Sequence, residues 1–153
     1  MKASAPVILV AALWLGGAAC QQQPGPLDAL HAMSPQVQWD TVVVRADVDG
    51  DGREDSAYLG RAGGRIYVGV VLAESEIVDV LDFAISGGIQ EAICSEPATL
   101  GVEDTDYPLS EIGPLQGFRP GTGARGLRLT GGECDSIHLF WDHDHARLGW
   151  WRL

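Results

Sequence analysis

The sequence has few basic residues: 10 lysines and arginines stand against 21 aspartates and glutamates, and the formal net charge is −11. A protein that binds nucleic acid needs a basic surface that meets the phosphates, so this shortage argues against nucleic acid as a partner. It also argues against electrostatic attachment to anionic lipid. Attachment to a membrane would therefore depend on apolar groups or on acyl chains.

The apolar run near the N-terminus, Ala3 to Leu15, is too short to span a bilayer, which takes about 20 residues. It follows Lys2 and precedes four small residues at 16–19, which is the order found in an export signal. Because Cys20 comes next, residues 1–19 resemble the signal peptide of bacterial lipoproteins. Ordinary secretory cleavage and an uncleaved anchor are the alternatives.

The lipoprotein resemblance implies a lipid on Cys20 and a location in the cell envelope, at the outer membrane if the host is Gram-negative. Residues 20–35 would then form the lipidated tether. Its first part is polar and punctuated by proline, and a short helix is expected between Pro26 and Pro35.

Cysteine is also scarce, with three in the chain. If Cys20 carries lipid, Cys94 and Cys134 remain, and a pair of cysteines in an exported protein favours a disulfide. Two buried free thiols are the alternative. Neither cysteine has a CxxC partner, which argues against a catalytic thiol.

Residues 36–153 are predicted to form one mainly β domain, a small sandwich or a twisted antiparallel meander. Alternating apolar and polar residues, rich in β-branched side chains, support this fold class. The segment 76–85 also fits a helix, and we favour a strand. Glycine and proline make most of 86–125 a loop. Strands are expected at residues 41–46, 55–60, 65–73, 76–85, 99–102, 126–130, 135–141 and 147–153.

The most informative stretch runs from Asp47 to Asp55, between two expected strands. It places aspartates at positions 1, 3, 5 and 9 and a glycine at position 6. Carboxylates held so close together would repel one another, and a cation relieves that repulsion. Calcium accepts about 6 to 8 oxygen ligands, so the spacing predicts a calcium site. The alternative is a polar, glycine-rich turn without an ion.

This loop resembles the calcium loop of FG-GAP (integrin-alpha-type) repeats. The resemblance implies that calcium is bound by four side chains and by the backbone carbonyl of Arg53. The four side chains are those of Asp47, Asp49, Asp51 and Asp55. The chain has one copy of the loop, so the resemblance implies the ion and the loop, not a propeller. An EF-hand would need glutamate where Tyr58 stands.

Two further segments are candidates for chemistry. His143 and His145 flank Asp144 and are a possible zinc or transition-metal pair, although aspartates between two strands are also ordinary turn formers. The GxGxxG pattern from Gly121 to Gly126 leads into an expected strand and is interpreted as a loop.

The C-terminal hairpin is rich in aromatic residues. Core packing explains most of them, but Trp150 and Trp151 face opposite sides of an expected strand, so one of them could be exposed to a partner or a glycan. The sequence thus predicts a non-catalytic, calcium-binding envelope lipoprotein in which the ion is mainly structural. The alternatives are a protein- or glycan-interaction module that uses this hairpin, and an unrecognised metal-dependent hydrolase.

Overall fold

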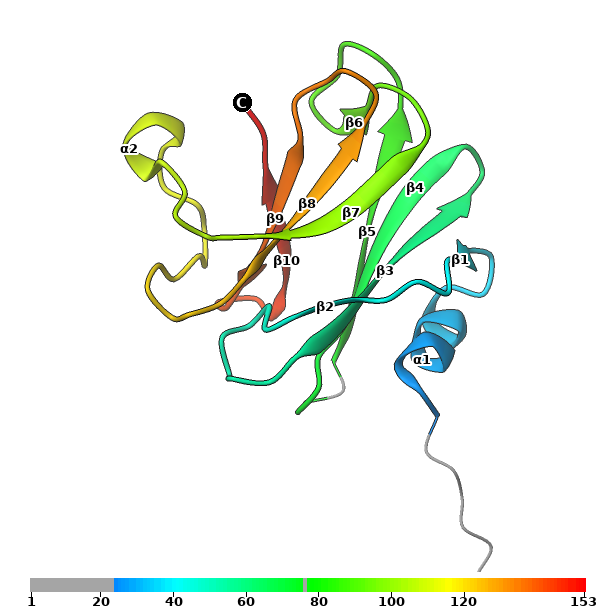
Figure 1. The fold of residues 1–153 in the computed structure, drawn as a ribbon, viewed down its shortest axis with the longest axis horizontal. Coiled ribbons are helices and arrows are strands. Elements are labelled where there is room, and N and C mark those ends of the chain that lie inside the picture. Colours follow the sequence, from blue (N-terminus) through cyan, green and yellow to red (C-terminus); the bar gives the residue numbers. More distant parts are fainter. Residues whose placement is uncertain (1–23, 76) are drawn as a thin grey trace, which may run out of the picture.

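Two β-sheets that face each other form the body of the protein (Figure 1). The computed structural model describes residues 24–75 and 77–153, so the predicted signal peptide and Cys20 lie outside the described residues. The mainly β fold predicted from the sequence is confirmed. In the part of the chain that is described, no helix is both long and apolar enough to cross a membrane.

The first sheet has six strands in the order β1-β3-β4-β5-β6, and β2 also pairs with β3. All of its pairs are antiparallel except the short parallel pair of β5 and β6. The strands are β1 (Gln38–Trp39), β2 (Val44–Ala46), β3 (Asp55–Ala62), β4 (Arg65–Val71), β5 (Val78–Ile85) and β6 (Ala92–Ile93).

The second sheet has four antiparallel strands in the order β10-β9-β8-β7. They are β7 (Ala98–Glu103), β8 (Gly126–Gly131), β9 (Ile137–Asp142) and β10 (Arg147–Trp151). The short helix α2 (Leu109–Ile112) lies in the long connection from β7 to β8, which projects away from the sheets (Figure 1). The two sheets approach each other at both sides, where β2 contacts β7 and β5 contacts β10.

The core between the sheets consists of the inward rows of the alternating strands. In the first sheet, the predicted face of Ile66, Val68, Val70 and Leu72 is buried. In the second, Ile137, Leu139 and Trp141 are buried in the same cluster, also as predicted. Each fully buried aliphatic side chain contributes about 1.5–3 kcal/mol, so this core holds the two sheets together.

Helix α1 (Pro26–Met33) packs on the outer face of the first sheet (Figure 1). Pro26 occupies its first turn, and the Asp28 carboxylate accepts a hydrogen bond from the Gly25 N–H at 2.9 Å. Leu30 is fully buried in a second apolar cluster with Trp39, and both side chains lie over Gly69, where a side chain would not fit. This helix agrees with the sequence prediction.

Three details differ from the prediction. The strand expected at residues 41–46 is the short β2, which begins at Val44 and not at Thr41, and Val42 is 75% exposed. The segment predicted as mostly loop contains β6 and α2, and β7 is longer than expected. β6 and α2 have only two and four residues, too few to show a periodic pattern, and β7 is completed by pairing with the distant β8.

Cys94 and Cys134 lie at disulfide distance, with their Cα atoms 5.6 Å apart. Cys94 follows β6 of the first sheet, and Cys134 lies in the turn from β8 to β9 of the second. The pair therefore connects the two sheets at the end opposite the acidic loop, the β2–β3 connection (Figure 1).

Candidate metal centre

The acidic loop, residues 47–54, connects β2 to β3. Ala46 and Asp55 are partners in the antiparallel pair, so the loop closes a hairpin, and Asp55 is the first residue of β3. Gly50 and Gly52 adopt φ values of 77° and 90°. This left-handed region is accessible to glycine at low cost, which allows the chain to fold back over its own carboxylates.

Three of the predicted ligands come together. Asp47, Asp49 and Asp55 each offer one carboxylate oxygen, and these oxygens lie within 4.8 Å of one another. Asp51 is exposed and its carboxylate is not one of the three, and the Arg53 side chain is exposed. The Arg53 guanidinium lies 3.5 Å from Glu74 at the surface. Within residues 24–75 and 77–153, no other group of histidines, cysteines and carboxylates has such an arrangement.

Asp55 is the most buried member, with 1% of its surface exposed. Its Oδ2 accepts a hydrogen bond from the Val48 N–H at 2.8 Å, and its Oδ1 accepts one from the Ala73 N–H at 2.9 Å. Burial raises the pKa of this carboxyl, although the two N–H groups oppose the rise. Asp55 therefore fixes the base of the loop in addition to facing the other carboxylates.

The other loop carboxylates accept hydrogen bonds from nearby backbone N–H groups. Asp47 accepts from Gly50 at 2.8 Å and from Gly52 at 2.9 Å. Asp49 accepts from Asp51 at 3.2 Å, and Asp51 accepts from Arg53 at 2.8 Å. The backbone thus curls around the carboxylate oxygens of Asp47 and Asp49.

Asp49, like Asp55, has a raised pKa. Burial raises the pKa of its carboxyl, and the carboxylates of Asp51 and Asp47 raise it further, whereas the Asp51 N–H and His143 lower it. Ionising Asp49 and Asp55 at neutral pH therefore carries a free-energy cost, and a divalent cation would offset that cost. Such a set of oxygens suits a hard cation better than a soft one.

The acidic loop is supported from the second sheet by residues 117–125, which lead into β8. The Arg125 N–H donates to the Asp47 carbonyl at 2.7 Å. A side chain at Gly50 would come within 3.1 Å of Thr122 and 3.3 Å of Ala124, so the two segments are in close contact. The sequence did not predict this contact. The GxGxxG pattern lies in this supporting segment and is a loop as interpreted, with Gly126 beginning β8.

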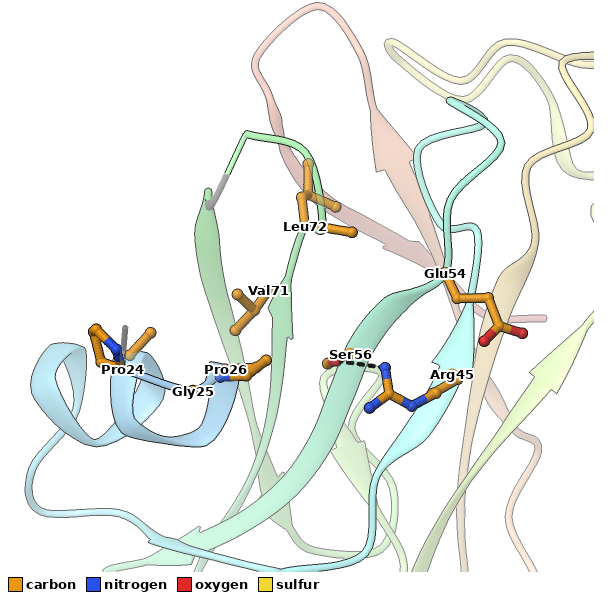
Figure 2. Close-up of a pocket in the computed structure, with 10 residues that line it drawn as sticks. Pro24, Gly25, Pro26, Arg45, Glu54, Ser56, Val71 and Leu72 are labelled. Atoms are coloured by element: carbon orange, nitrogen blue, oxygen red, sulfur yellow. Dashed lines mark hydrogen bonds between the residues drawn. The ribbon is translucent and has the colours of Figure 1, made fainter. Parts of the chain in front are cut away.

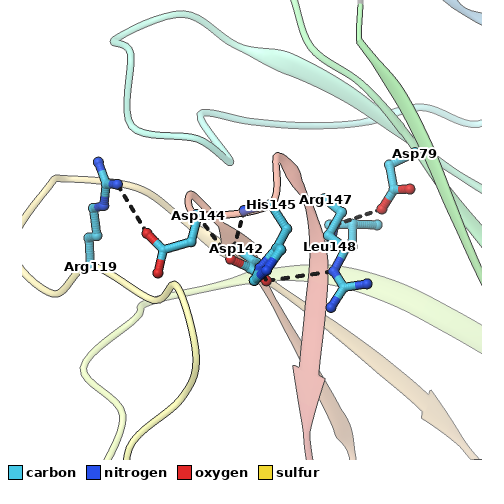
Figure 3. A network of polar contacts seen from close by, with 7 residues as sticks. All are labelled: Asp79, Arg119, Asp142, Asp144, His145, Arg147 and Leu148. Carbon is cyan, nitrogen blue, oxygen red and sulfur yellow. Dashed lines mark hydrogen bonds and ion pairs between the residues drawn. The ribbon is translucent and has the colours of Figure 1, made fainter.

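The turn from Asp142 to His145 is organised by the buried carboxylate of Asp142, which is 3% exposed. This carboxylate lies 2.8 Å from His145 Nδ1 and accepts hydrogen bonds from the N–H groups of Asp144 and His145 (Figure 3). Burial alone would raise the pKa of Asp142, but these hydrogen bonds outweigh burial and lower it. The arrangement is that of an aspartate-stabilised turn. His143 and His145 do not complete a metal-binding group among the described residues.

The outer face of the second sheet carries a polar and aromatic cluster that the sequence analysis missed. His138 Nδ1 lies 2.9 Å from both Glu103 oxygens, and the Tyr107 hydroxyl donates to Glu103 Oε1 at 2.9 Å. Trp151 stacks on His138 with ring centroids 4.2 Å apart. Tyr107 lies in the proline-rich connection, where no periodicity marks it.

The two tryptophans of the last strand face opposite sides, as predicted, but neither ring is freely exposed. Trp151 is 9% exposed beneath Tyr107. Trp150 is half-buried and lies edge-on to Phe83, with ring centroids 6.0 Å apart. The expectation that one of them presents an open ring to a partner is wrong for Trp151.

A hollow of about 360 Å³ lies between the start of α1 and the strands that flank the acidic loop (Figure 2). Arg45 and Ser56 face each other in it, 3.4 Å apart, and Glu54 lies at its rim. Glu54 is the one carboxylate in its lining, which contains no histidine, so this hollow does not offer a paired general acid and base.

Comparison of the chain with known protein families, curated proteins and solved structures found no match.

Proposed function

We propose that the protein is a non-catalytic, calcium-binding lipoprotein of the cell envelope, and that the ion orders the acidic loop. The observation that carries this proposal is the convergence of Asp47, Asp49 and Asp55, with one oxygen from each within 4.8 Å of the others. These oxygens come from a turn whose backbone already curls around them. Calcium prefers such oxygen ligands in a flexible loop.

The resemblance to FG-GAP loops supplies the remaining ligands of the proposal. The Asp51 side chain and the Arg53 carbonyl would complete the set. Asp51 now accepts a hydrogen bond from Arg53 and is exposed, so it can turn toward an ion without disturbing the core. Asp55 is held by two N–H groups and would be the fixed ligand around which the others close.

Binding of the ion would order segments that belong to both sheets. Asp47 is hydrogen-bonded to Arg125, and Gly50 packs on Thr122 and Ala124. An ion that orders residues 47–55 would therefore also restrain the segment that leads into β8. Because the ion binds the folded loop and not the unfolded chain, the free energy of unfolding would rise with free calcium.

Calorimetric titration of the full chain tests the proposed site. We expect one calcium per chain, with loss of binding in Asp49→Ala. Asp135→Ala is a suitable control because it removes an exposed aspartate outside the loop. Calcium binding that survives Asp49→Ala, or that is weakened equally by Asp135→Ala, would contradict the assignment.

The lipid anchor is tested separately. If Cys20 is lipidated, mass spectrometry of the cellular protein will show acyl chains on an N-terminal Cys20. The Cys20→Ala variant will then lose both the acyl chains and its partition into detergent. A mature chain that begins elsewhere, or an unmodified Cys20, would refute the anchor but leave the calcium proposal intact.

A further inference from the structure

A row of three residues crosses the outer face of the first sheet beside the start of α1. Arg45 of β2 pairs with Ser56 of β3, and Ser56 pairs with Val71 of β4. Residues directly opposite each other in antiparallel strands have their side chains on the same face of the sheet. The adjacent pair, Ala57 and Val70, belongs to the core between the sheets, so the row faces outward. All three side chains line the hollow of about 360 Å³ (Figure 2).

Arg45 supplies a positive charge that no carboxylate of the chain neutralises by direct contact. Most other arginines lie within ion-pair distance of an aspartate or glutamate, namely Arg53, Arg61, Arg65, Arg119, Arg125 and Arg147. Within residues 24–75 and 77–153, Arg45 has no such partner, and its guanidinium donates to Ser56 Oγ at 3.4 Å. The chain has 21 acidic and 10 basic residues, so this guanidinium is an uncommon binding group for an external anion.

The Ser56 hydroxyl adds a second hydrogen-bond donor at the same place. Ser56 is 3% exposed, and its oxygen accepts the bond from Arg45. A serine hydroxyl also carries one proton to donate, and in the part of the chain that is described no side-chain or backbone oxygen receives it. Buried polar groups usually have their hydrogen-bond partners. An oxygen atom placed between Arg45 and Ser56 would accept from both, and the long bond between them would be replaced at little cost.

The other side of the hollow is apolar. Pro26 and Ala29 of α1 line it, together with Val71 of β4. The volume of about 360 Å³ lies at the lower end of the range for small-molecule sites, which is about 300–1,000 Å³. A carboxylate matches the planar guanidinium group with its two oxygens. A ligand with a carboxylate head and a short alkyl chain would therefore meet donors at one side of the hollow and apolar side chains at the other.

The remaining charges near the hollow limit the charge of the ligand. Glu54 is the one carboxylate in the lining, and it is exposed at the rim. Asp28, in the first turn of α1, accepts a hydrogen bond from the Gly25 N–H. One cation thus faces the hollow with one exposed anion beside it. This balance favours a ligand with a single negative charge over a multiply charged one.

We propose that the hollow binds a small amphiphilic anion, a monocarboxylate with a short alkyl chain. Its carboxylate lies between Arg45 and Ser56, and its chain lies against α1 and Val71. The hollow is on the outer face of the first sheet, and its binding groups are not ligands of the acidic loop. Binding is therefore measured in chelator, where a failure leaves the calcium proposal intact.

An NMR titration of the full chain with sodium hexanoate tests the site. Hexylammonium chloride has the same alkyl chain with the opposite charge, and inorganic phosphate is an anion without an alkyl chain. We expect saturable shifts of the Ser56 and Val71 amide signals with hexanoate. Hexylammonium and phosphate should each bind at least about tenfold more weakly, because each lacks one half of the recognition.

A matched pair of arginine variants tests the position of the charge. Arg45→Gln should weaken hexanoate binding by about tenfold or more, because it removes the charged donor. Arg128→Gln makes the same change of net charge at an exposed arginine of β8, outside the hollow, and should leave the affinity unchanged. Arg45 is itself exposed, so its substitution should preserve the fold, and the amide spectrum of the ligand-free variant checks this.

Three results would overturn the proposal. The first is a hexanoate titration without a saturable shift of the Ser56 amide. The second is binding of hexylammonium or phosphate as tight as that of hexanoate, because the anionic head or the alkyl chain would then contribute nothing. The third is equal weakening of hexanoate binding by Arg45→Gln and Arg128→Gln, which would show an effect of net charge and not a contact in the hollow.

Discussion

The backbone carbonyl of Asp47 accepts a hydrogen bond from the Arg125 N–H at 2.7 Å. Asp47 begins the acidic loop of the first sheet, and Arg125 directly precedes β8 of the second. The contact is reinforced by Gly50, which lies against Thr122 and Ala124. The candidate metal centre therefore lies at a contact between the two sheets. A change in the order of the loop should also change the order of the segment that leads into β8.

The two loop glycines should differ in their tolerance of alanine. Both have positive φ, so each substitution should cost about 1–2 kcal/mol of unfolding free energy. Gly50→Ala should cost more, because its new methyl group would meet Thr122 at 3.1 Å, whereas no atom lies within 4 Å of the methyl group in Gly52→Ala. Urea unfolding in chelator measures the difference. Equal losses of unfolding free energy in the two variants would show that Gly50 is not in tight contact with residues 117–125.

Substitutions of Asp55 and Asp49 should have different effects, because Asp55 stabilises the fold and Asp49 would mainly bind the ion. Asp55→Ala leaves the N–H groups of Val48 and Ala73 without their acceptor, which should cost about 2–4 kcal/mol even in chelator. Asp49→Ala should change the free energy of unfolding in chelator by less than about 0.5 kcal/mol. Equilibrium denaturation of both variants, with and without calcium, measures this. An Asp49→Ala loss as large as that of Asp55→Ala would contradict the separation.

Stabilisation by calcium should depend on pH. Burial raises the pKa of Asp49 and of Asp55 above 3.8, so the calcium-free folded chain binds their protons more tightly than the unfolded chain does. The stability of the calcium-free form should therefore fall as pH rises through these pKa values, and calcium should offset that fall. We expect the increase in Tm caused by calcium to be largest near neutral pH and to shrink toward pH 4.

The buried Asp142 also titrates at acid pH, but it should not change the difference in Tm between calcium and chelator. Its pKa is lowered, so the stability that it contributes is lost only as pH falls below 3.8, and the loss should be the same with and without calcium. Melting curves across the pH range, recorded in calcium and in chelator, give the increase directly. An increase that grows as pH falls would argue against carboxylate ligands.

Tyr107 should resist ionisation and should stabilise the connection from β7 to β8. Burial, and then the Glu103 carboxylate, raises the pKa of its phenol far above the usual value of about 10. In an alkaline ultraviolet titration, Tyr107→Phe should therefore give the same phenolate signal as the wild type up to about pH 11. The variant should lose about 1–2 kcal/mol of unfolding free energy, because the hydrogen bond to Glu103 is gone. A smaller phenolate signal in the variant would contradict this account.

The sequence predicted the regular parts of the fold because their patterns are local. Alternation from Ile66 to Leu72 identified both a strand and its buried face, and the same held for β9. Pro26 and Pro35 bounded the helical segment α1. The β-branched residues of 76–85 correctly favoured a strand over a helix.

The features that the sequence did not predict depend on distant residues. Nothing near Glu103 indicates that it meets His138, 35 residues later. The support that Thr122 and Ala124 give to the acidic loop also joins segments from different sheets. Within the candidate site, the spacing of the aspartates identified the carboxylates but did not predict that they differ in burial and in hydrogen bonding. Asp55 is buried and doubly hydrogen-bonded, and Asp51 is exposed, because β3 begins at Asp55.

The most direct test of the central proposal is thermal melting of the full chain after chelation, with calcium, magnesium or zinc added back, beside the Asp49→Ala variant. The account predicts that calcium raises Tm more than magnesium does, that zinc has no comparable effect, and that the increase disappears in Asp49→Ala. If calcium leaves Tm unchanged, the acidic loop is a polar turn and the proposed function fails. If zinc alone raises Tm, the ion site lies elsewhere and the histidines of the Asp142–His145 turn become the place to look.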